Sequence, residues 1–286
     1  MLPPLPDAGR IPPERLRLPR VSLLCVETLR TPLALHAMER CMRDIDFGEC
    51  LLLGPRPVAA HPRIRHVAIP DIDSVAQYSE FMVRRLGDHF SLDHVLVVQW
   101  DGFVTSAACW DERFLDYDYI GAPWAGRAMA VGNGGFSLRS RRLVDALQRI
   151  DTPVTHPEDE VICTRHRLEL EQHHGIRFAP LEVASRFSWE QAAPETPTFG
   201  FHAFFNFHRV LSEPELIDYF RECDDALLQS VPARRLLKNL YRAGMHAAAA
   251  ELLRLRLRGS LGMKLDAAKL RSFAWLRDTR RAALSP

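Results

Sequence analysis

Four short, uninterrupted runs of hydrophobic residues divide the first third of the chain. The first two have the continuous apolar character of strands that are buried on both faces of a sheet, and the others predict a short third strand and a fourth. Helical segments separate them, and one of these opens at Ser74 and Gln77 with the spacing of a capping box. This alternation predicts an open, mainly parallel α/β sheet flanked by helices. The runs are VSLLCVET (21–28), ECLLLGP (49–55), IRHVAIP (64–70) and HVLVVQW (94–100), and the first helical segment is LALHAMERCMRD (33–44).

The pattern changes after the fourth run. Between Trp110 and Ser140, aromatic residues and glycines follow no clear period, which predicts loops built over the sheet. Ser140 is expected to cap the helix that follows it, and a longer helix is predicted over 157–174, before Gly175. The segment at 177–188 predicts a strand.

From Leu211 onward the pattern is helical, with a hairpin of two helices expected around Gly244. We therefore expect three regions along the chain. They are an extended, proline-rich lead-in at 1–20, an α/β domain at 21–210 and a basic helical region at 211–286.

Charge is distributed unevenly between these regions. The chain has 37 Lys and Arg against 36 Asp and Glu, but residues 231–286 contain thirteen of the basic residues and three of the acidic ones. A basic region on an acidic body indicates an anionic partner, such as a membrane surface, nucleic acid or a charged glycan. A solvated helical face packed against the acidic body would explain it equally well. We expect peripheral contact with a membrane and no nucleic acid.

Composition and targeting signals indicate the cellular setting. No run of 18 apolar residues is long enough to span a membrane, and the proline- and charge-containing N-terminus lacks the apolar stretch of a signal peptide. The six cysteines are scattered without framework spacing, which is typical of reduced, mostly buried thiols. We therefore expect a cytoplasmic protein, with any membrane contact at the inner face.

Candidate chemistry gathers where strands of the predicted sheet end, which is where open α/β sheets bind ligands. The first strand ends at Thr28 without a dinucleotide fingerprint or a P-loop after it, so an ordinary dehydrogenase or NTPase is not indicated. The fourth ends in Gln99-Trp100-Asp101-Gly102. A carboxylate there can hold a divalent ion through oxygen ligation, although Asp-Gly is also a common turn pair.

Three later motifs each allow a functional and a structural interpretation. Gly134 and Gly135 permit close approach of a ligand or a simple loop crossing. The acids at 158–160 either complement a helix dipole or supply a general base. His202, within an aromatic run, is either a core histidine or a ligand. No HExxH, GxSxG or zinc-type spacing is present, so metalloproteases and serine hydrolases lose their usual support.

The order of these motifs resembles that of a known family. QWDGFV, FLDYDYIGAPW, VGNGGFSLRS, HPEDEVIC and FGFH resemble a domain family of unknown function that is related to the GT-A nucleotide-sugar glycosyltransferases. The resemblance covers 21–208 and leaves out the basic region. More distantly, the order is similar to that of inverting β-1,3- and β-1,4-galactosyltransferase-type enzymes. It implies a GT-A-like, Rossmann-like sheet and a role in polysaccharide biosynthesis.

Residue by residue, the resemblance implies a metal-assisted site. Asp101 would be the final acid of a DxD motif and His202 the late histidine that completes a Mn²⁺ or Mg²⁺ site, whereas Gln99 stands where the first acid is expected. Asp159 would be the catalytic base beside Glu158, and the choice between Asp159 and Glu160 stays open. The donor, for which we expect a UDP-sugar, would contact Thr28, Gln99, Trp100, Asp101, Gly134 and Gly135, and the acceptor would lie on Tyr119 and Trp124.

The resemblance therefore implies an inverting glycosyltransferase that moves a sugar from a nucleotide-sugar to a hydroxyl of a glycan or lipid-linked acceptor. Two alternatives stay open. One is a non-catalytic glycan- or protein-binding module on the same fold. The other is a nucleotidyltransferase, because a metal-held acid after a strand serves that chemistry too.

Overall fold

A computed structural model describes residues 15–57, 61–124, 126–127, 131–150, 153–259, 262, 264–266 and 269–270. Residues 1–14 of the predicted lead-in and 271–286 of the basic region lie outside the described residues. The first strand begins at Leu16, so the end of the predicted lead-in is already part of the sheet. The predicted membrane contact of the basic region therefore stays a prediction. No helix within the described ranges is long and apolar enough to cross a membrane.

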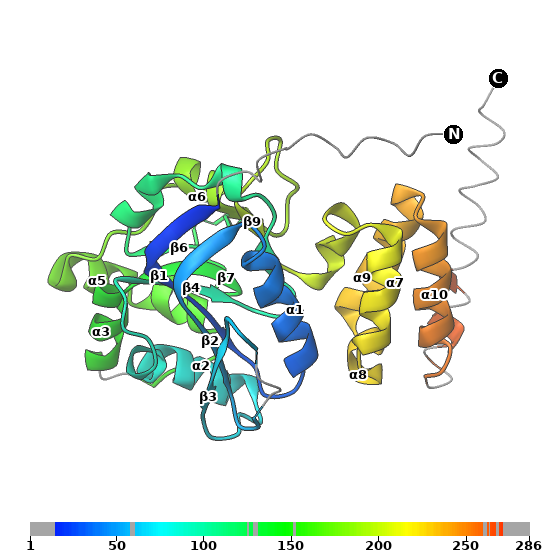
Figure 1. Ribbon diagram of the computed structural model, residues 1–286, viewed down its shortest axis with the longest axis horizontal. Coiled ribbons are helices and arrows are strands. Elements are labelled where there is room, and N and C mark those ends of the chain that lie inside the picture. Colours follow the sequence, from blue (N-terminus) through cyan, green and yellow to red (C-terminus); the bar gives the residue numbers. More distant parts are fainter. Residues whose placement is uncertain are drawn as a thin grey trace, which may run out of the picture.

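A six-stranded sheet forms the centre of the molecule, and it confirms the predicted α/β fold (Figure 1). Its strands are β1 (Leu16–Val26), β2 (Ile45–Gly54), β3 (Arg65–Ala68), β4 (His94–Val98), β6 (Tyr119–Ile120) and β7 (Phe136–Ser140). They lie in the order β3-β2-β1-β4-β7-β6. The first four are parallel, whereas β7 pairs antiparallel with both β4 and β6. The carboxyl ends of the parallel strands and the amino end of β7 therefore share one edge of the sheet.

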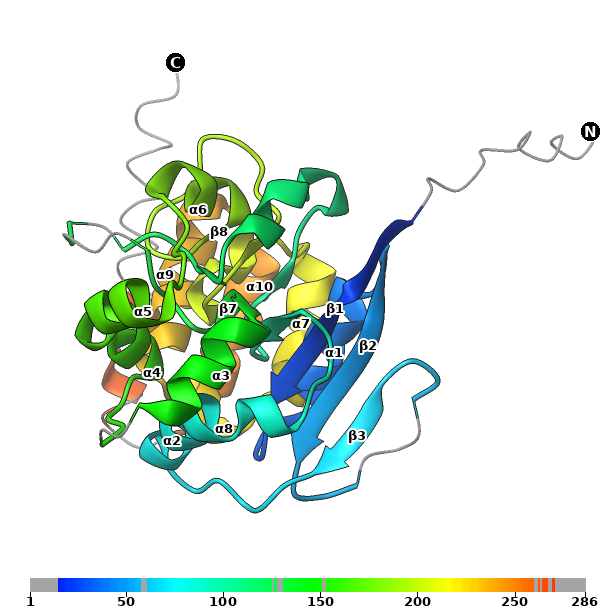
Figure 2. The same cartoon turned by 90° about the vertical axis from the view of Figure 1, so that its left-hand side faces the viewer.

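Helices cover both faces of this sheet because successive strand residues point to opposite sides. Leu23 and Cys25 of β1 belong to the hydrophobic cluster under α1, whereas Leu24 and Val26 pack in the cluster under α2 and α3. Figure 2 looks onto the face that α2 and α3 cover. The helices up to β7 and beyond are α1 (Thr31–Cys41), α2 (Val75–Arg84), α3 (Arg141–Arg149), α4 (Glu158–Glu160), α5 (Arg167–His174) and α6 (Leu181–Phe187).

A second, three-stranded sheet lies beside the first, built from β5 (Phe103–Val104), β9 (Gly200–Phe201) and β8 (Ser188–Trp189). Buried aromatic rings hold it in place. The rings of Phe103 and Phe201 pack edge to face at 4.7 Å, and both contact Phe207. This packing fixes the position of the residue that follows β9, which is His202.

The C-terminal helices α7 (Glu213–Glu222), α8 (Asp225–Gln229), α9 (Val231–Ala243) and α10 (His246–Arg256) stand together beside the α/β part, with α1 facing them (Figure 1). Gly244, with φ of 75°, joins α9 and α10 and confirms the predicted hairpin. Arg40 of α1 pairs with Glu215 of α7 at 2.5 Å. The helical region is therefore joined to the sheet through α1 as well as through the chain.

Several local predictions are wrong, each for a physical reason. Residues 136–140 form a central strand and not a loop, because the polar residues Ser137 and Arg139 of β7 are buried and hide its strand pattern. The segment 177–188 forms helix α6 and not a strand, since Pro180 occupies the N-cap position and starts a helix. The helix predicted over 157–174 is broken by a π-helical turn at Val161–Arg165.

Other expectations hold. Ser74 and Ser140 cap α2 and α3 as predicted, and Gly175 ends α5 in the left-handed conformation. All six cysteines are free thiols, of which Cys25, Cys41, Cys50 and Cys163 are buried.

The two serine caps allow a matched stability test. Ser140 accepts from the Leu143 N–H and also donates to the buried Asp118 carboxylate at 2.5 Å, whereas the exposed Ser74 accepts only from Gln77. Ser74→Ala should lower the free energy of unfolding by about 1 kcal/mol, the usual cost of a lost cap. Ser140→Ala should cost about 2–3 kcal/mol, because a buried acceptor also loses its partner.

Urea denaturation of both variants and the unaltered protein measures this difference. Equal losses would show that the Ser140–Asp118 hydrogen bond adds no stability.

Candidate active site

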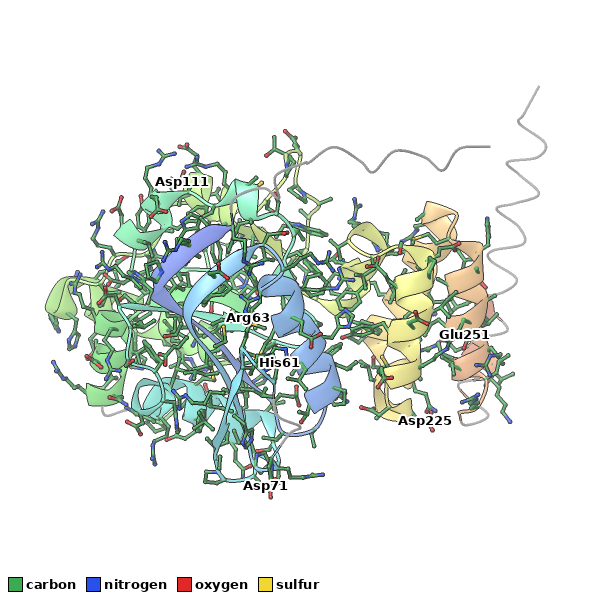
Figure 3. All side chains as sticks on the ribbon, in the orientation of Figure 1. His61, Arg63, Asp71, Asp111, Asp225 and Glu251 are labelled. Carbon is green, nitrogen blue, oxygen red and sulfur yellow. The ribbon has the colours of Figure 1, made fainter. Side chains whose placement is uncertain are left out.

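Residues from four distant segments meet at the sheet edge where the parallel strands end. In Figure 3 the labelled Asp71, three residues after β3, marks this edge. Gln99 and Asp101 follow β4, and Gly135 immediately precedes β7. The Gln99 N–H donates to the Gly135 carbonyl at 3.0 Å, which holds the two segments together.

His202 lies at the centre of this group. Its Nε2 is 3.2 Å from Asp101 Oδ1 and 3.2 Å from Gln99 Oε1. On the other side of the ring, Nδ1 is 3.3 Å from Asn133 Nδ2 and 3.7 Å from Glu190 Oε1. The imidazole thus lies between two carboxylates.

The charges of these neighbours shift the pKa values of His202, Asp101 and Glu190. Burial on its own lowers the pKa of His202, but Asp101 and Glu190 outweigh it and raise that pKa to about 10. Burial raises the pKa of Asp101, yet the charge on His202 and the Phe204 N–H bring it below its ordinary value. Glu190 behaves in the same way beside His202. Without a bound ligand, the imidazolium is thus held between two ionised carboxylates.

The two predicted glycines make this close packing possible. A Cβ built on Gly135 would lie 2.1 Å from His202 Nε2, and one on Gly134 would lie 2.3 Å from Glu158 Oε1. Both distances are far below van der Waals contact. Gly134 and Gly135 are therefore required by the side chains that pack on them, in addition to any role in binding a sugar.

The three acids of the segment 158–160 have different environments. Asp159 is half-buried, and its Oδ2 accepts from the Gly134 N–H at 3.0 Å. Glu160 forms an ion pair with Arg127 at the surface. Glu158 is buried and pairs with Arg139 at 3.3 Å. Asp159 is thus the acid that lies directly against the glycine loop and still reaches solvent.

Arg139 and Glu158 form a buried ion pair beneath the glycines. The Arg139 side chain is fully buried, and its guanidinium lies 5.7 Å from the centre of the Tyr119 ring. Burial raises the pKa of Glu158, while the adjacent Arg139 lowers it. The pair supports the site from below and does not face solvent.

A cavity of 380 Å³ opens at the carboxyl ends of β1 and β4. Predicted donor-binding residues Thr28, Gln99 and Trp100 line it, together with Tyr78 and Glu158. Gln99 Nε2 donates to the Tyr78 hydroxyl at 2.9 Å, which turns its amide oxygen toward His202. Arg30 lies 5.7 Å over the Trp100 ring at the rim. The cavity thus reaches from the end of β1 to a residue that contacts His202.

A second cavity, of 550 Å³, lies on the Glu190 side of His202. It is lined by Trp124, Arg127, Trp189 and Glu190. The Trp124 ring stands against Gly132 and carries the Arg127 guanidinium at 4.5 Å. Trp124 thus lines this cavity, and its contact with an acceptor stays a prediction.

The acceptor prediction for Tyr119 is wrong. Its side chain is fully buried and packs against Phe178. It belongs to the edge strand β6, and its ring packs in the hydrophobic core under the helices and cannot reach a ligand in the cavity.

The sequence interpretation missed Glu190, Asn133 and Tyr78. Glu190 follows a segment that was assigned to a strand, and nothing in its spacing links it to His202. Asn133 has a φ of 55°, a conformation that asparagine tolerates. Its place beside two glycines was the one available signal. Tyr78 lies on α2, where an aromatic residue at helical spacing indicates only core packing.

The donor atoms around His202 are of kinds that bind divalent cations in proteins. In the described part of the chain no three His, Cys, Asp or Glu side chains form a metal-binding group. Asp101 Oδ1, His202 Nε2 and Gln99 Oε1 nevertheless offer a carboxylate, an imidazole and an amide oxygen. Their 3.2 Å separations are close to the roughly 3 Å between adjacent ligands of an ion with bonds of about 2.1 Å. Ion binding would displace the proton from Nε2.

The buried pair beneath the glycines yields a prediction. Arg139→Met should lower the free energy of unfolding by about 3–5 kcal/mol, because it leaves the Glu158 charge buried and unpaired. Arg142→Met, two residues into α3 and 61% exposed, should cost less than about 1 kcal/mol. The double variant Arg139→Met/Glu158→Gln should have a higher free energy of unfolding than Arg139→Met, because it no longer buries an unpaired carboxylate.

Chemical denaturation of the four proteins provides the comparison. If the double variant were no more stable than Arg139→Met, an unpaired carboxylate would not be the cause.

The chain is similar to one family model over part of its length. A family model described as a protein of unknown function (DUF5672) matches residues 63–202, slightly less than half of the chain. This stretch contains Gln99, Asp101, Gly135 and His202. No curated protein matches the sequence.

Three solved structures of glycosyltransferases match the chain at low similarity. The apo-form glycosyltransferase GlyE from Streptococcus pneumoniae TIGR4 is 12% identical, with a TM-score of 0.38 over 64% of this chain and 54% of that one. The mannosyltransferase PcManGT from Pyrobaculum calidifontis, solved with GDP-Man and Mn²⁺, is 12% identical, with a TM-score of 0.40 over 94% and 85%. A glycosyltransferase involved in glycosylation of the major capsid of PBCV-1 is 14% identical, with a TM-score of 0.41 over 64% and 91%. This chain thus spans little more than half of the pneumococcal one.

Proposed function

We propose that this protein is a glycosyltransferase that moves a sugar from a nucleotide-sugar donor to a hydroxyl of a glycan or lipid-linked acceptor. One observation carries the proposal. His202 contacts a lining residue of each of two cavities, Gln99 of the first and Glu190 of the second. A group-transfer reaction brings the reacting ends of two substrates together at one polar centre. The contacts of His202 with residues of both cavities support such a reaction here.

The 380 Å³ cavity is proposed as the donor site. Trp100 and Tyr78 offer aromatic surfaces for a nucleoside, and Thr28 lies at the end of β1 with its hydroxyl donating to the Ile72 carbonyl at 3.0 Å. A UDP-sugar is the donor we propose. The diphosphate would then point toward Asp101 and His202.

Asp101, His202 and the amide oxygen of Gln99 are proposed to hold a Mn²⁺ or Mg²⁺ ion. When bound, such an ion would supply charge stabilisation of the departing nucleoside diphosphate. Gln99 carries no charge, so this site has one negative charge fewer than a pair of acids would give. The protein's own contribution is to fix these donors: Phe204 N–H holds Asp101 at 3.1 Å, and Tyr78 holds Gln99.

Asp159 is proposed as the general base. The Gly134 N–H holds its Oδ2, and the Glu160 N–H donates to Oδ1 at 2.8 Å, so the carboxylate has a fixed orientation beside the glycine loop. It would take the proton of the acceptor hydroxyl as that oxygen attacks the anomeric carbon. Attack on the side opposite the leaving group would invert the configuration. Trp124 and Trp189 are proposed to hold the acceptor in the 550 Å³ cavity.

Donor binding is tested by thermal unfolding with a panel of nucleoside diphosphates, each with and without Mn²⁺. We expect one of them to raise the Tm by several degrees, since ligand at a hundredfold its Kd adds about 2.7 kcal/mol to the stability of the native state. Mn²⁺ should enlarge this shift in the unaltered protein and not in Asp101→Asn.

The control is Asp225→Asn, which makes the same charge change at an exposed residue of α8 (Figure 3). It should retain the Mn²⁺ effect. A panel without any shift would favour a non-catalytic binding module.

Transfer assays with Asp159→Asn and Glu160→Gln test the base. Asp159→Asn should lower the rate of transfer by about 10²–10⁴-fold, the usual contribution of a general base. Glu160→Gln should stay within a few-fold, because its side chain is engaged by Arg127 at the surface. A large loss in Glu160→Gln and a small one in Asp159→Asn would assign the base to Glu160. Formation of a nucleotidyl product would show that the protein is a nucleotidyltransferase and not a glycosyltransferase.

A further inference from the structure

A third cavity, of 520 Å³, lies between the segment after Glu190 and helix α9. Three arginines line it: Arg209 from the turn after β9, and Arg235 and Arg242 from α9. Gln191, His208 and Asn239 contribute further polar groups. None of the residues that line this cavity is acidic.

The three guanidinium groups have no carboxylate partner among the described residues, whereas 19 arginine–carboxylate pairs form elsewhere in the described part of the chain. Contacts with aromatic and amide groups nevertheless orient two of these three side chains, Arg235 and Arg242.

 Arg235 lies 3.5 Å over the Phe205 ring and donates to Gln191 Oε1 at 3.1 Å, and Arg242 donates to Asn239 Oδ1 at 3.0 Å. Aromatic and amide contacts of this kind orient a guanidinium and leave its charge uncompensated.

Like charges gathered without a counter-ion repel one another. His208 lies in the same group, and burial together with the charges of Arg209 and Arg242 lowers its pKa to about 4. The histidine is therefore neutral at physiological pH and adds hydrogen-bonding capacity without further charge. The cavity as a whole has the charge and donor groups that an oxyanion requires.

This cavity adjoins the proposed acceptor site. Gln191 and Ala193 line both the 520 Å³ and the 550 Å³ cavities. Glu190, the residue before them, contacts His202. A ligand that crosses the short segment 191–193 would place one end among the arginines and the other beside the proposed reaction centre.

We propose that the arginine cavity binds a phosphate group of the acceptor. The inference rests on the proposed function, because it takes the 550 Å³ cavity as the acceptor site. Guanidinium groups form paired hydrogen bonds with phosphate oxygens, and the cavity has room for a diphosphate together with part of the group attached to it. The phosphate would hold the acceptor so that its hydroxyl faces Asp159.

The test uses inorganic pyrophosphate as the probe and the full chain in metal-free buffer, with binding measured by calorimetry. Arg235→Gln combined with Arg242→Gln should weaken binding by roughly tenfold or more, since each substitution removes charge-assisted hydrogen bonds to the phosphate oxygens. The control pair is Arg221→Gln with Arg254→Gln. Both control residues are exposed and pair with acids of their own helices, Arg254 with Glu251, labelled on α10 in Figure 3.

The control pair removes the same charge and should leave pyrophosphate binding within a few-fold. Arg235→Gln also loses packing on Phe205, so Arg242→Gln alone, at an exposed position, serves as a second variant with a smaller loss in the same direction. Equal binding by the cavity and control variants, or no binding by the unaltered protein, would overturn the inference.

Two further arms identify the source of the phosphate. Phosphatidylcholine vesicles with and without phosphatidic acid test a lipid phosphate by co-sedimentation, and the pyrophosphate titration tests a soluble one. Vesicle binding that needs phosphatidic acid, Arg235 and Arg242 supports a lipid-linked acceptor, whereas pyrophosphate binding alone supports a soluble one.

The outcome is also separable from that of the proposed function. Arginine-dependent pyrophosphate binding in a protein that binds no nucleotide and transfers no sugar would keep an anion site and remove the transferase. Sugar transfer in a protein without arginine-dependent phosphate binding would remove only the inference.

Discussion

The absence of side chains at Gly134 and Gly135 is the constraint on which the candidate site depends. His202 and Glu158 come from segments that are far apart in the sequence, and each packs where a Cβ would stand. Any larger residue would separate the imidazole from Asp101 or the Glu158 carboxylate from Arg139. Both glycines form the turn that immediately precedes the interior strand β7, so the sheet fixes where this turn lies.

Two kinds of polar group follow from this arrangement. The buried Arg139–Glu158 pair is closed to solvent and supports the glycines from below. Asp101, His202 and Glu190 are only partly buried; Glu190 lines the 550 Å³ cavity, and His202 contacts Gln99, which lines the 380 Å³ cavity. The pair packs beneath the glycines, and under the proposed function the second group would carry the chemistry, a division between support and chemistry that enzyme sites commonly show.

Much of this could be predicted from the sequence. Buried parallel strands show as continuous apolar runs, so β1, β2, β4 and the position of Asp101 after β4 followed from pattern alone, and a shorter run predicted the partly exposed edge strand β3. β7 could not be found in this way, because three of its five residues, Ser137, Arg139 and Ser140, are polar, and two of them are satisfied by the distant acids Glu158 and Asp118. Tyr119 was placed wrongly for a related reason: an aromatic residue next to loops gives no sign of whether it faces the core.

The family resemblance and the structure identify different residues of the candidate site. The motif order suggested that Asp101 and His202 belong together, and the structure places them 3.2 Å apart. Glu190 had no such signal, since its link to His202 arises from the pairing of β8 with β9 and not from spacing along the chain. Sequence patterns do not predict which side chains meet across a small sheet whose strands are only two residues long.

The contacts of the C-terminal helices have a consequence for the modularity of the chain. Tyr219 of α7 donates its hydroxyl hydrogen to the carbonyl of Trp100, and Asn239 of α9 donates to the carbonyl of Phe205. Both carbonyls belong to the segments that carry Asp101 and His202. Truncation of the protein at residue 210 would thus remove two hydrogen bonds that hold the candidate site in place. Fragments or fusions that keep the C-terminal helices are the ones expected to retain the geometry of this site.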